Sequence, residues 1–223
     1  MGIYQGLILK QTCVLCSEQA NFCICDTCAQ DFSSSPQRCK TCAYPITGHL
    51  DFCIPCLTNS PAFNRTYTLY DYQGAIAQLI KDFKYNQQFC IGNYFARQLY
   101  TLYQTLPSYD AILPMPLSKQ RIKQRGFNQT LELLRKIQQR TKTPIDIRSV
   151  QRIKATQPLF ELTPEQRRAE IKGAFSVTSM PYKKILLVDD IITTGASLNE
   201  LAITIIKNTQ VTHCDVMTLA RAE

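Results

Sequence analysis

The sequence has no long hydrophobic run and no recognisable targeting segment. No stretch approaches the roughly 18 apolar residues that a membrane-spanning helix needs. The first 12 residues hold one charge, at Lys10, and lack the long apolar core of a secretory signal. Position 6 is Gly6, where an N-myristoylation site has serine or threonine. We therefore expect no membrane span and a cytoplasmic location.

Two common phosphate-binding motifs are also missing. Neither the P-loop of nucleoside triphosphatases nor the glycine-rich loop of dinucleotide-binding domains occurs anywhere in the chain. Charged residues make up 19% and hydrophobic residues 45%, which is typical of a globular chain and not of a disordered one. The formal net charge of +8 favours an anionic partner.

Cysteine, by contrast, is abundant, at 11 residues, and eight of these form four Cys-x-x-Cys pairs. In a reducing compartment such pairs are typical of metal ligands rather than of disulfides. Two pairs complete a tetrahedron with no open position, so the sequence predicts two structural zinc ions. In sequence order, the ligands are Cys13, Cys16, Cys25 and Cys28 for one ion and Cys39, Cys42, Cys53 and Cys56 for the other.

A crossed pairing of the four motifs remains open at this point. Cys23 stands off the pattern, and we expect it to be a spare cysteine. His49 lies between two pairs, and we expect a loop residue rather than a ligand. Cys90 and Cys214 are expected to be buried as small apolar residues.

The chain divides into two parts. The two halves of the cysteine-rich region have nearly the same layout, which indicates one small zinc-ribbon-like unit used twice. After Pro61 the pattern changes to alternating strands and helices. We therefore place a zinc-binding module at residues 1–62 and an α/β domain with a mainly parallel sheet at residues 63–223.

The elements of the second part follow from apolar periodicity. Strands are expected at 65–72, 111–116, 183–188 and 211–219, and helices at 127–139 and 196–208. Two further helices are expected to bury Ala75, Ile76, Leu79, Ile80 and Phe83, and Phe95, Leu99, Leu102, Tyr103 and Leu106. A capping box from Thr163 to Gln166 predicts another helix start.

The most informative segment runs from residue 185 to residue 197. An apolar strand ends in two adjacent carboxylates, Asp189 and Asp190, and a small hydroxyl-rich loop then opens a helix. The loop and the helix start supply backbone N–H groups and hydroxyls that suit a phosphate monoester. Carboxylates at the carboxyl end of a strand suit a sugar diol or a hydrated Mg²⁺. The pattern predicts a site for a ribose 5-phosphate that carries a pyrophosphate.

The sequence Val-Asp-Asp-Ile-Ile-Thr-Thr-Gly at 188–195 resembles the diphosphate-sugar signature of type I phosphoribosyltransferases. Four further features resemble one branch of these proteins, the ComF family of competence-associated proteins. They are the cysteine pairs and the segments Leu113-Pro114-Met115-Pro116-Leu117, Arg125-Gly126-Phe127-Asn128-Gln129 and Gly173-Ala174-Phe175. The resemblance covers nearly the whole chain. It implies a type I phosphoribosyltransferase fold that binds phosphoribosyl pyrophosphate with Mg²⁺, and a role in natural transformation with incoming single-stranded DNA.

The resemblance also implies a set of site residues. Asp189 and Asp190 would hold the ribose hydroxyls, and Lys84 and Tyr85 would form the pyrophosphate loop. Arg125 lies in the segment that corresponds to the mobile hood over the pyrophosphate, and with the acidic pair it is the candidate catalytic group. The 5-phosphate would be bound by Thr193, Thr194, Gly195, Ala196 and Ser197. Gln157 and Arg167 resemble the glutamine and arginine that precede Gly-Ala-Phe in the family.

A basic stretch at 118–142 leaves two interpretations open. Its candidate DNA-binding residues are Lys119, Arg121, Lys123 and Arg125, which alternate along the chain. These cations can neutralise pyrophosphate. They can equally follow a nucleic-acid backbone, with Phe127 or a tyrosine stacking on bases.

Three functions remain at this stage. The first is a competence protein that handles single-stranded DNA, with competence-machinery proteins as further candidate partners. The second is a metabolic phosphoribosyltransferase that acts on an amine or a base. The third is a DNA-binding adaptor with a vestigial site.

Overall fold

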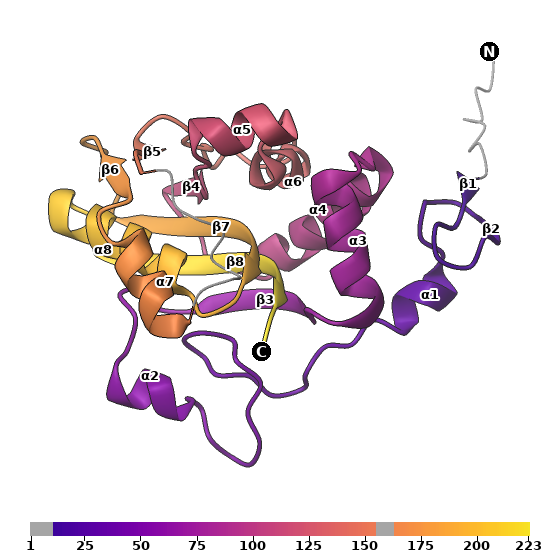
Figure 1. The fold of residues 1–223 in the computed structure, drawn as a ribbon, viewed down its shortest axis with the longest axis horizontal. Helices are drawn as coiled ribbons and strands as arrows, with labels where there is room; N and C mark the ends of the chain where they lie inside the picture. Colours follow the sequence, from indigo (N-terminus) through magenta and orange to yellow (C-terminus); the bar gives the residue numbers. More distant parts are fainter. Residues whose placement is uncertain (1–10, 155–162) are drawn as a thin grey trace.

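The computed structural model describes residues 11–154 and 163–223, and a four-stranded sheet forms its centre (Figure 1). The strands are β3 (Thr66–Asp71), β4 (Ala111–Pro114), β7 (Lys184–Ile192) and β8 (His213–Arg221). They lie in the order β3-β8-β7-β4, and every neighbouring pair is parallel. The predicted α/β class with a mainly parallel sheet is confirmed.

Helices cover both faces of this sheet. On one face lie α3 (Gly74–Tyr85), α4 (Phe89–Gln104) and α6 (Gln129–Gln138), and on the other lies α8 (Ala196–Asn208). Successive side chains of a strand point to opposite faces. Leu186 and Val188 of β7 therefore pack with α3, α4 and α6, whereas Ile185 and Leu187 pack with α8. Burial on both faces explains why residues 185–188 of this strand are all apolar.

Several expected boundaries were wrong. β7 continues to Ile192, so the acidic pair lies inside the strand and not after it. Ala75 is exposed, because the buried face of α3 begins at Ile76. Leu106 lies beyond the end of α4. α8, by contrast, spans the residues expected for it.

The basic stretch begins with a helix that the sequence analysis missed. Helix α5 covers Lys119–Arg125. The Ser118 side chain caps its start by accepting a hydrogen bond from Arg121 N, at 3.3 Å. Gly126 ends it in the left-handed conformation, at φ +80°. The same analysis also missed a small antiparallel sheet of two strands, β5 (Val150–Arg152) and β6 (Phe175–Val177).

The helix expected after Thr163 is α7 (Pro164–Ile171), and its capping box is present. Thr163 Oγ1 accepts from Gln166 N at 3.3 Å, and Gln166 Oε1 accepts from Thr163 N at 2.8 Å. Across residues 11–154 and 163–223, no helix combines the length and the apolar character that crossing a membrane requires.

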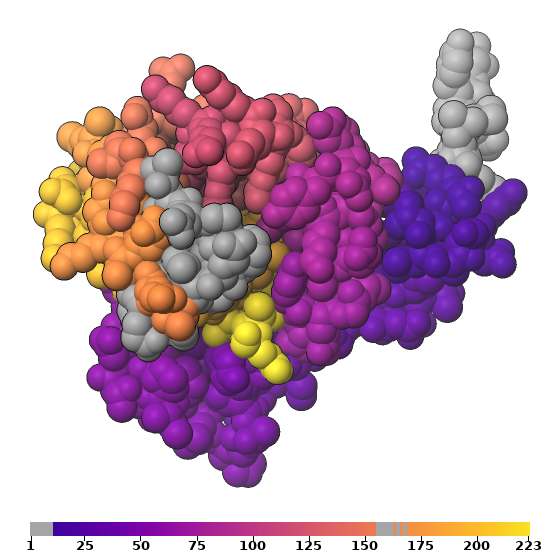
Figure 2. Space-filling view, in the orientation of Figure 1, coloured from indigo at the N-terminus to yellow at the C-terminus, as the bar shows by residue number. Residues whose placement is uncertain are grey.

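The cysteine-rich region forms two separate pieces (Figure 2). The first contains β1 (Gln11–Thr12), β2 (Gln19–Ala20) and α1 (Asp26–Gln30), and it projects beside α4. Arg97 of α4 stacks on Phe22 of this piece, with 4.0 Å between the guanidinium carbon and the ring centroid. The second piece contains α2 (Ile54–Thr58) and lies below the sheet in the view of Figure 1.

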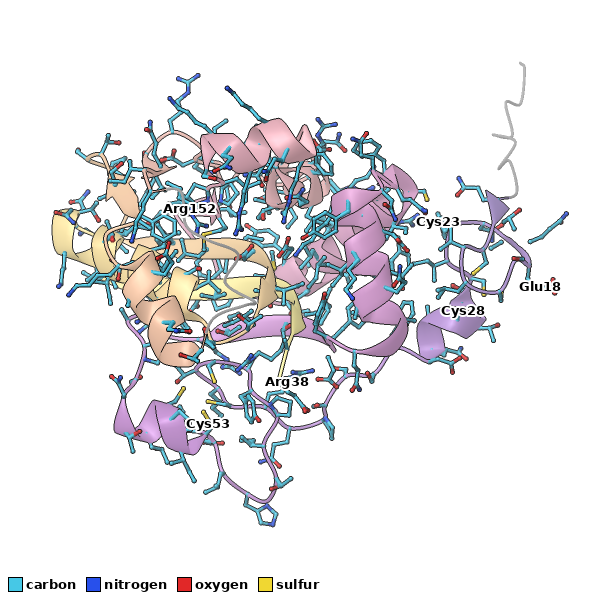
Figure 3. The ribbon with its side chains drawn as sticks, in the orientation of Figure 1. Glu18, Cys23, Cys28, Arg38, Cys53 and Arg152 are labelled. Carbon is cyan, nitrogen blue, oxygen red and sulfur yellow. The ribbon has the colours of Figure 1, made fainter. Side chains whose placement is uncertain are left out.

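The segment that joins these two pieces, residues 33–40, runs beside β3. At one end of the strand Asp71 N donates to Ser33 O at 3.0 Å, and at the other Thr66 N donates to Lys40 O at 3.4 Å. Arg38, labelled in Figure 3, forms a salt bridge with the Asp71 carboxylate. Because β3 is an edge strand of the sheet, this segment accompanies an edge that would otherwise be open.

Candidate functional site

The acidic pair of β7 lies close to cations from three other elements, which are Lys84 of α3, Arg121 of α5 and Arg152 of β5. Asp190 is 9% exposed, and one of its carboxylate oxygens lies 2.9 Å from Lys84 Nζ at the end of α3. Asp189 is half-buried, and its Oδ1 accepts a hydrogen bond from Asp190 N at 2.8 Å. The structure therefore brings together Lys84 and the acidic pair, which lie more than 100 residues apart in the sequence.

Burial changes the acidity of Asp189. It raises the pKa of this carboxyl from 3.8 to about 7, and repulsion from the Asp190 carboxylate adds to the rise. The backbone N–H of Asp190 and the charges of Lys84 and Arg152 act in the opposite direction. A carboxyl with this pKa is partly protonated at neutral pH. A cation bound next to it would restore its charge, so the group suits a hydrated metal ion or a sugar hydroxyl.

The loop after β7 leaves the start of α8 open. Gly195 stands at the N-cap in the left-handed conformation, at φ +74°, and makes no side-chain cap. Thr194 Oγ1 accepts from Ala196 N at a long 3.4 Å, and Thr193 and Thr194 are both exposed. Backbone N–H groups at a helix start attract a phosphate group. The expected 5-phosphate residues thus form one continuous loop and helix start directly beyond the acidic pair.

Arg125 joins the two segments expected to bind pyrophosphate. Its guanidinium donates to Tyr85 OH at 3.2 Å and lies 5.1 Å from the centroid of the Tyr85 ring. It also donates to Gln129 Oε1 at 3.0 Å, which fixes the arginine to the start of α6. Lys84 and Tyr85 end α3, so α3, α5 and α6 converge beside the acidic pair.

The helical form of α5 divides its cations into two sets. Residues four apart share a helix face. Arg121 and Arg125 are partly buried, whereas Lys119 and Lys123 are exposed. Burial and the neighbouring charge of Arg125 lower the pKa of Arg121, and attraction to both carboxylates of the acidic pair opposes this change. The four cations that alternate along the chain therefore fall on two faces of α5.

Arg152 is a residue of the site that the sequence analysis missed. It is the last residue of β5, and Figure 3 labels it above the central sheet in that view. Burial lowers its pKa to about 10, with a further contribution from Arg121, and attraction to Asp189 opposes the change. The guanidinium also lies 5.7 Å from the centroid of the Phe175 ring. No local motif marks this arginine, because its position depends on the pairing of two strands that are separated by 22 residues.

Three other expected residues take no part in the described site. Gln157 lies outside the described residues, and Arg167 lies on α7 with its side chain outside the description. Phe127 packs against Phe83 and Phe89, at centroid distances of 5.7 and 5.3 Å. Its ring serves the core, so the suggestion that it stacks on bases is not supported.

The eight paired cysteines gather into two groups, in sequence order. All four sulfur atoms of each group lie within 4.8 Å of one another. Cys16 Sγ and Cys25 Sγ, from different motifs, are 3.7 Å apart, and Cys42 Sγ and Cys53 Sγ are 3.6 Å apart. The groups comprise Cys13, Cys16, Cys25 and Cys28, and Cys39, Cys42, Cys53 and Cys56. In Figure 3, Cys28 and Cys53 mark them on different sides of the α/β domain.

Backbone N–H groups point at the sulfur atoms, as in a site built for thiolates. Cys25 N donates to Cys13 Sγ at 3.4 Å. Burial alone would raise the pKa of Cys13, but N–H groups of Cys25, Cys16 and Leu15 outweigh it and lower the pKa to about 6. The donor set, the spacing and the closed tetrads fit zinc.

The remaining cysteines divide differently from the expectation. Cys214 is fully buried, as expected. Cys90 lies in the first turn of α4 and is exposed, contrary to the expectation. Cys23 is buried outside both tetrads and lies near Cys90.

Comparison with known proteins identifies relatives along nearly the whole chain, although no protein-family model matches it. Competence protein F of Haemophilus influenzae is 31% identical over 209 residues, which cover 89% of this chain and 90% of that protein. DNA utilization protein YhgH of Escherichia coli O157:H7 is 29% identical over 196 residues, covering 83% and 85%. Competence protein ComFC of Streptococcus pneumoniae is 26% identical over 208 residues, covering 87% and 86%. With the paired cysteine tetrads and this similarity along its length, the chain belongs to the ComF family of competence-associated proteins.

Proposed function

We propose that this chain has the type I phosphoribosyltransferase fold and binds phosphoribosyl pyrophosphate with Mg²⁺ at the carboxyl end of β7. The observation that carries the proposal is the position of the acidic pair directly before the open N-terminus of α8. The helix start and its hydroxyl-rich loop would bind the 5-phosphate. Asp189 and Asp190 would accept hydrogen bonds from the ribose hydroxyls and orient water molecules of the metal ion.

Four cations near the acidic pair support the pyrophosphate part of the proposal. Lys84 and Arg125 come from the two segments that the resemblance assigns to pyrophosphate, and Arg121 and Arg152 add charge from α5 and β5. Preorganised cations of this kind stabilise negative charge that develops on a leaving pyrophosphate. Tyr85, which is 63% exposed, remains accessible at the same place.

We further propose that each cysteine tetrad holds one structural zinc ion. Four thiolates leave no coordination position for a substrate, so these ions would hold the two cysteine-rich pieces in shape. They would take no part in phosphoribosyl chemistry.

For the biological role, we propose natural competence in the cytoplasm, with incoming single-stranded DNA as the partner. The names of the relatives, two competence proteins and a DNA utilization protein, support this role. On α5, Lys119 and Lys123 are the exposed cations that a DNA backbone could reach, whereas Arg121 and Arg125 lie toward the sugar-phosphate site. Proteins of the competence machinery are further candidate partners.

Calorimetry tests the ligand. Wild-type protein should bind phosphoribosyl pyrophosphate in the presence of Mg²⁺, and the double variant Asp189→Asn/Asp190→Asn should bind 10 to 100 times more weakly. That loss corresponds to about 1.5–3 kcal/mol for charged hydrogen bonds. The matched control is Asp31→Asn, an exposed carboxylate on the N-terminal piece. Equal binding by the wild type and the double variant would reject the site.

Pyrophosphate release separates the competence role from a metabolic one. The protein is incubated with phosphoribosyl pyrophosphate and Mg²⁺, with and without single-stranded DNA, and with a panel of amines and free bases. Release that depends on DNA supports the competence role. Release with a small acceptor and no response to DNA would favour a metabolic phosphoribosyltransferase instead.

A further inference from the structure

Arg221, the last residue of β8, is 7% exposed and makes an unusual set of contacts with main-chain oxygen atoms. Its Nε donates to Cys42 O at 3.1 Å. Its Nη1 donates to Ile192 O at 3.2 Å, and it also donates to the carbonyl oxygens of Thr193 and Ala222. The guanidinium lies 5.1 Å from the centroid of the Tyr44 ring. One buried side chain therefore contacts two segments about 150 residues apart in the sequence.

The two segments belong to different sites. Cys42 is a member of the second cysteine tetrad, and its carbonyl belongs to the turn that places the sulfur atom. Ile192 ends β7, and Thr193 begins the proposed 5-phosphate loop. The main chain adds a second tie to the loop, because Ala222 N donates to Ile192 O at 2.9 Å. A displacement of the turn at Cys42 would thus shift Arg221 and, with it, the first residues of the loop.

Charge makes this link depend on the metal. A buried cation is costly unless an anion lies close to it. Among the described residues, no carboxylate forms a salt bridge with Arg221. A zinc ion with four thiolates carries a formal charge of about −2, and the second tetrad is the group that could place this charge beside the guanidinium. Without the ion, the two Cys-x-x-Cys motifs that position the turn at Cys42 are no longer joined through a common metal.

The first tetrad serves as the comparison, because Arg221 does not contact its cysteines. Its piece contacts α4, through Phe22 on Arg97 and Phe32 against Tyr94, and also β3, through Phe32 against Tyr70. The Phe32 ring centroid lies 6.2 Å from that of Tyr94 and 5.6 Å from that of Tyr70. None of these contacts reaches the loop after β7. Loss of metal from the first tetrad should therefore leave that loop unchanged.

We propose that the second zinc ion controls the phosphate loop through Arg221. With metal bound, the turn at Cys42 holds Arg221, and Arg221 holds Ile192 and Thr193 in position for a sugar phosphate. Metal loss releases the loop and weakens binding. The identity of the ligand rests on the proposed function, but the mechanical link between tetrad and loop does not. By thermodynamic reciprocity, a ligand that fixes the loop must also strengthen zinc binding at the second tetrad.

A pair of matched cysteine variants tests the link without a ligand. Cys28→Ser and Cys56→Ser each remove the last cysteine of one tetrad, and both cysteines are half-buried. Hydrogen–deuterium exchange is measured on the amides of residues 192–197. We expect exchange there to rise at least fivefold in Cys56→Ser and to stay at the wild-type rate in Cys28→Ser. Equal exchange in the two variants would overturn the proposal.

Misfolding of Cys56→Ser could also speed exchange, so a second variant is needed. Arg221→Lys serves this purpose because it keeps all eight cysteine ligands. Lysine preserves the charge but cannot donate from separate nitrogen atoms to both segments. We expect this variant to retain two zinc ions, by metal analysis, and to show the same faster exchange at 192–197. Slow, wild-type exchange in Arg221→Lys would contradict the role of the arginine.

Zinc release tests the reciprocal effect. A colorimetric chelator is added with and without phosphoribosyl pyrophosphate and Mg²⁺, using Cys28→Ser so that only the second site reports. We expect the ligand to slow release about fivefold, within the range of ordinary coupling, and to have no effect when Arg221→Lys is added. Undiminished slowing in that double variant would count against the proposal. Absence of ligand binding by the wild type, together with loop exchange that follows the second zinc, would refute the proposed ligand and leave the link standing.

Discussion

The ammonium group of Lys84 lies 2.9 Å from a carboxylate oxygen of Asp190, and each side chain is only 13% exposed. This ion pair ties the end of α3 to β7 before any ligand binds. The lysine that the resemblance assigns to pyrophosphate therefore already neutralises the carboxylate assigned to ribose. A ligand that enters must share this lysine or displace it.

The pair makes a prediction about stability. Lys84→Met should destabilise the fold by about 3 kcal/mol, because removing one partner leaves a buried charge uncompensated. The double variant Lys84→Met/Asp190→Asn should recover part of that loss, since neither charge remains. Urea denaturation of both single variants and the double variant measures the coupling. Strictly additive effects would show that the two groups do not stabilise each other.

A second prediction concerns pH and follows from Asp189. Its pKa is raised from 3.8 to about 7, so the folded chain holds a proton that the unfolded chain releases near pH 4. The contribution of this group to folding is most favourable below pH 4, and it falls as the pH rises from 4 to 7. Binding of Mg²⁺ with phosphoribosyl pyrophosphate needs the carboxylate, so affinity should increase over the same range.

Calorimetry in buffers of different ionisation enthalpy measures this effect, because binding near pH 6 should release protons. Asp189→Asn removes the titrating group and should abolish that part of the proton release. Proton release of the same size in the variant would assign the effect to another group.

A third prediction concerns Gly195. Alanine at this position would hold a left-handed conformation that costs roughly 1–2 kcal/mol, and its Cβ would lie 3.5 Å from Ile192 Cδ1. We expect Gly195→Ala to weaken binding of phosphoribosyl pyrophosphate, because relief of the strain moves the N–H groups of the loop. Gly48→Ala, at φ +78° in a remote open loop, is the matched control for stability. Equal ligand affinity in both variants would remove the loop from the site.

A fourth prediction separates the two faces of α5. Each phosphate contact with single-stranded DNA contributes about −0.7 to the slope of log affinity against log salt. Lys119→Ala/Lys123→Ala should therefore flatten the slope by roughly 1.4 units and leave sugar-phosphate affinity unchanged. Arg121→Ala/Arg125→Ala should mainly reduce sugar-phosphate affinity. A DNA slope that responds only to the arginine pair would reverse this assignment.

A fifth prediction concerns metal content. Purified protein should contain two zinc ions per chain, and Cys13→Ser or Cys39→Ser should unfold the corresponding piece. Structural zinc contributes on the order of 10–16 kcal/mol in small domains. Metal analysis with circular dichroism checks both statements. Soluble, folded protein without zinc would contradict them.

Local patterns predicted much of this molecule. The periodicity of α8, the apolar run of β7 and the spacing of the cysteines are each visible within a short stretch of sequence. Helix α5 also carried local signals, since Ser118 and Gly126 flank it as N-cap and left-handed terminator. These signals did not enter the prediction, because only the charges of this stretch were considered.

What the sequence did not predict depends on distant parts of the chain. Arg152 lies near the acidic pair because β5 pairs with β6, which follows it after 22 intervening residues in the sequence. Arg221 belongs to no sequence motif, and its contacts with Cys42 and Ile192 form only in the folded chain. A single sequence carries no pattern for contacts of this kind, since their spacing is set by the tertiary fold.

The segment at 33–40, which runs beside β3, has a consequence for solubility. An open edge strand offers unpaired N–H and C=O groups to the edge of another molecule, which is a common route to aggregation. Because this segment is anchored between the two cysteine tetrads, loss of both metals would free it and expose β3. Chelation should thus lead to intermolecular β-sheet and precipitation, and not to a soluble unfolded N-terminus.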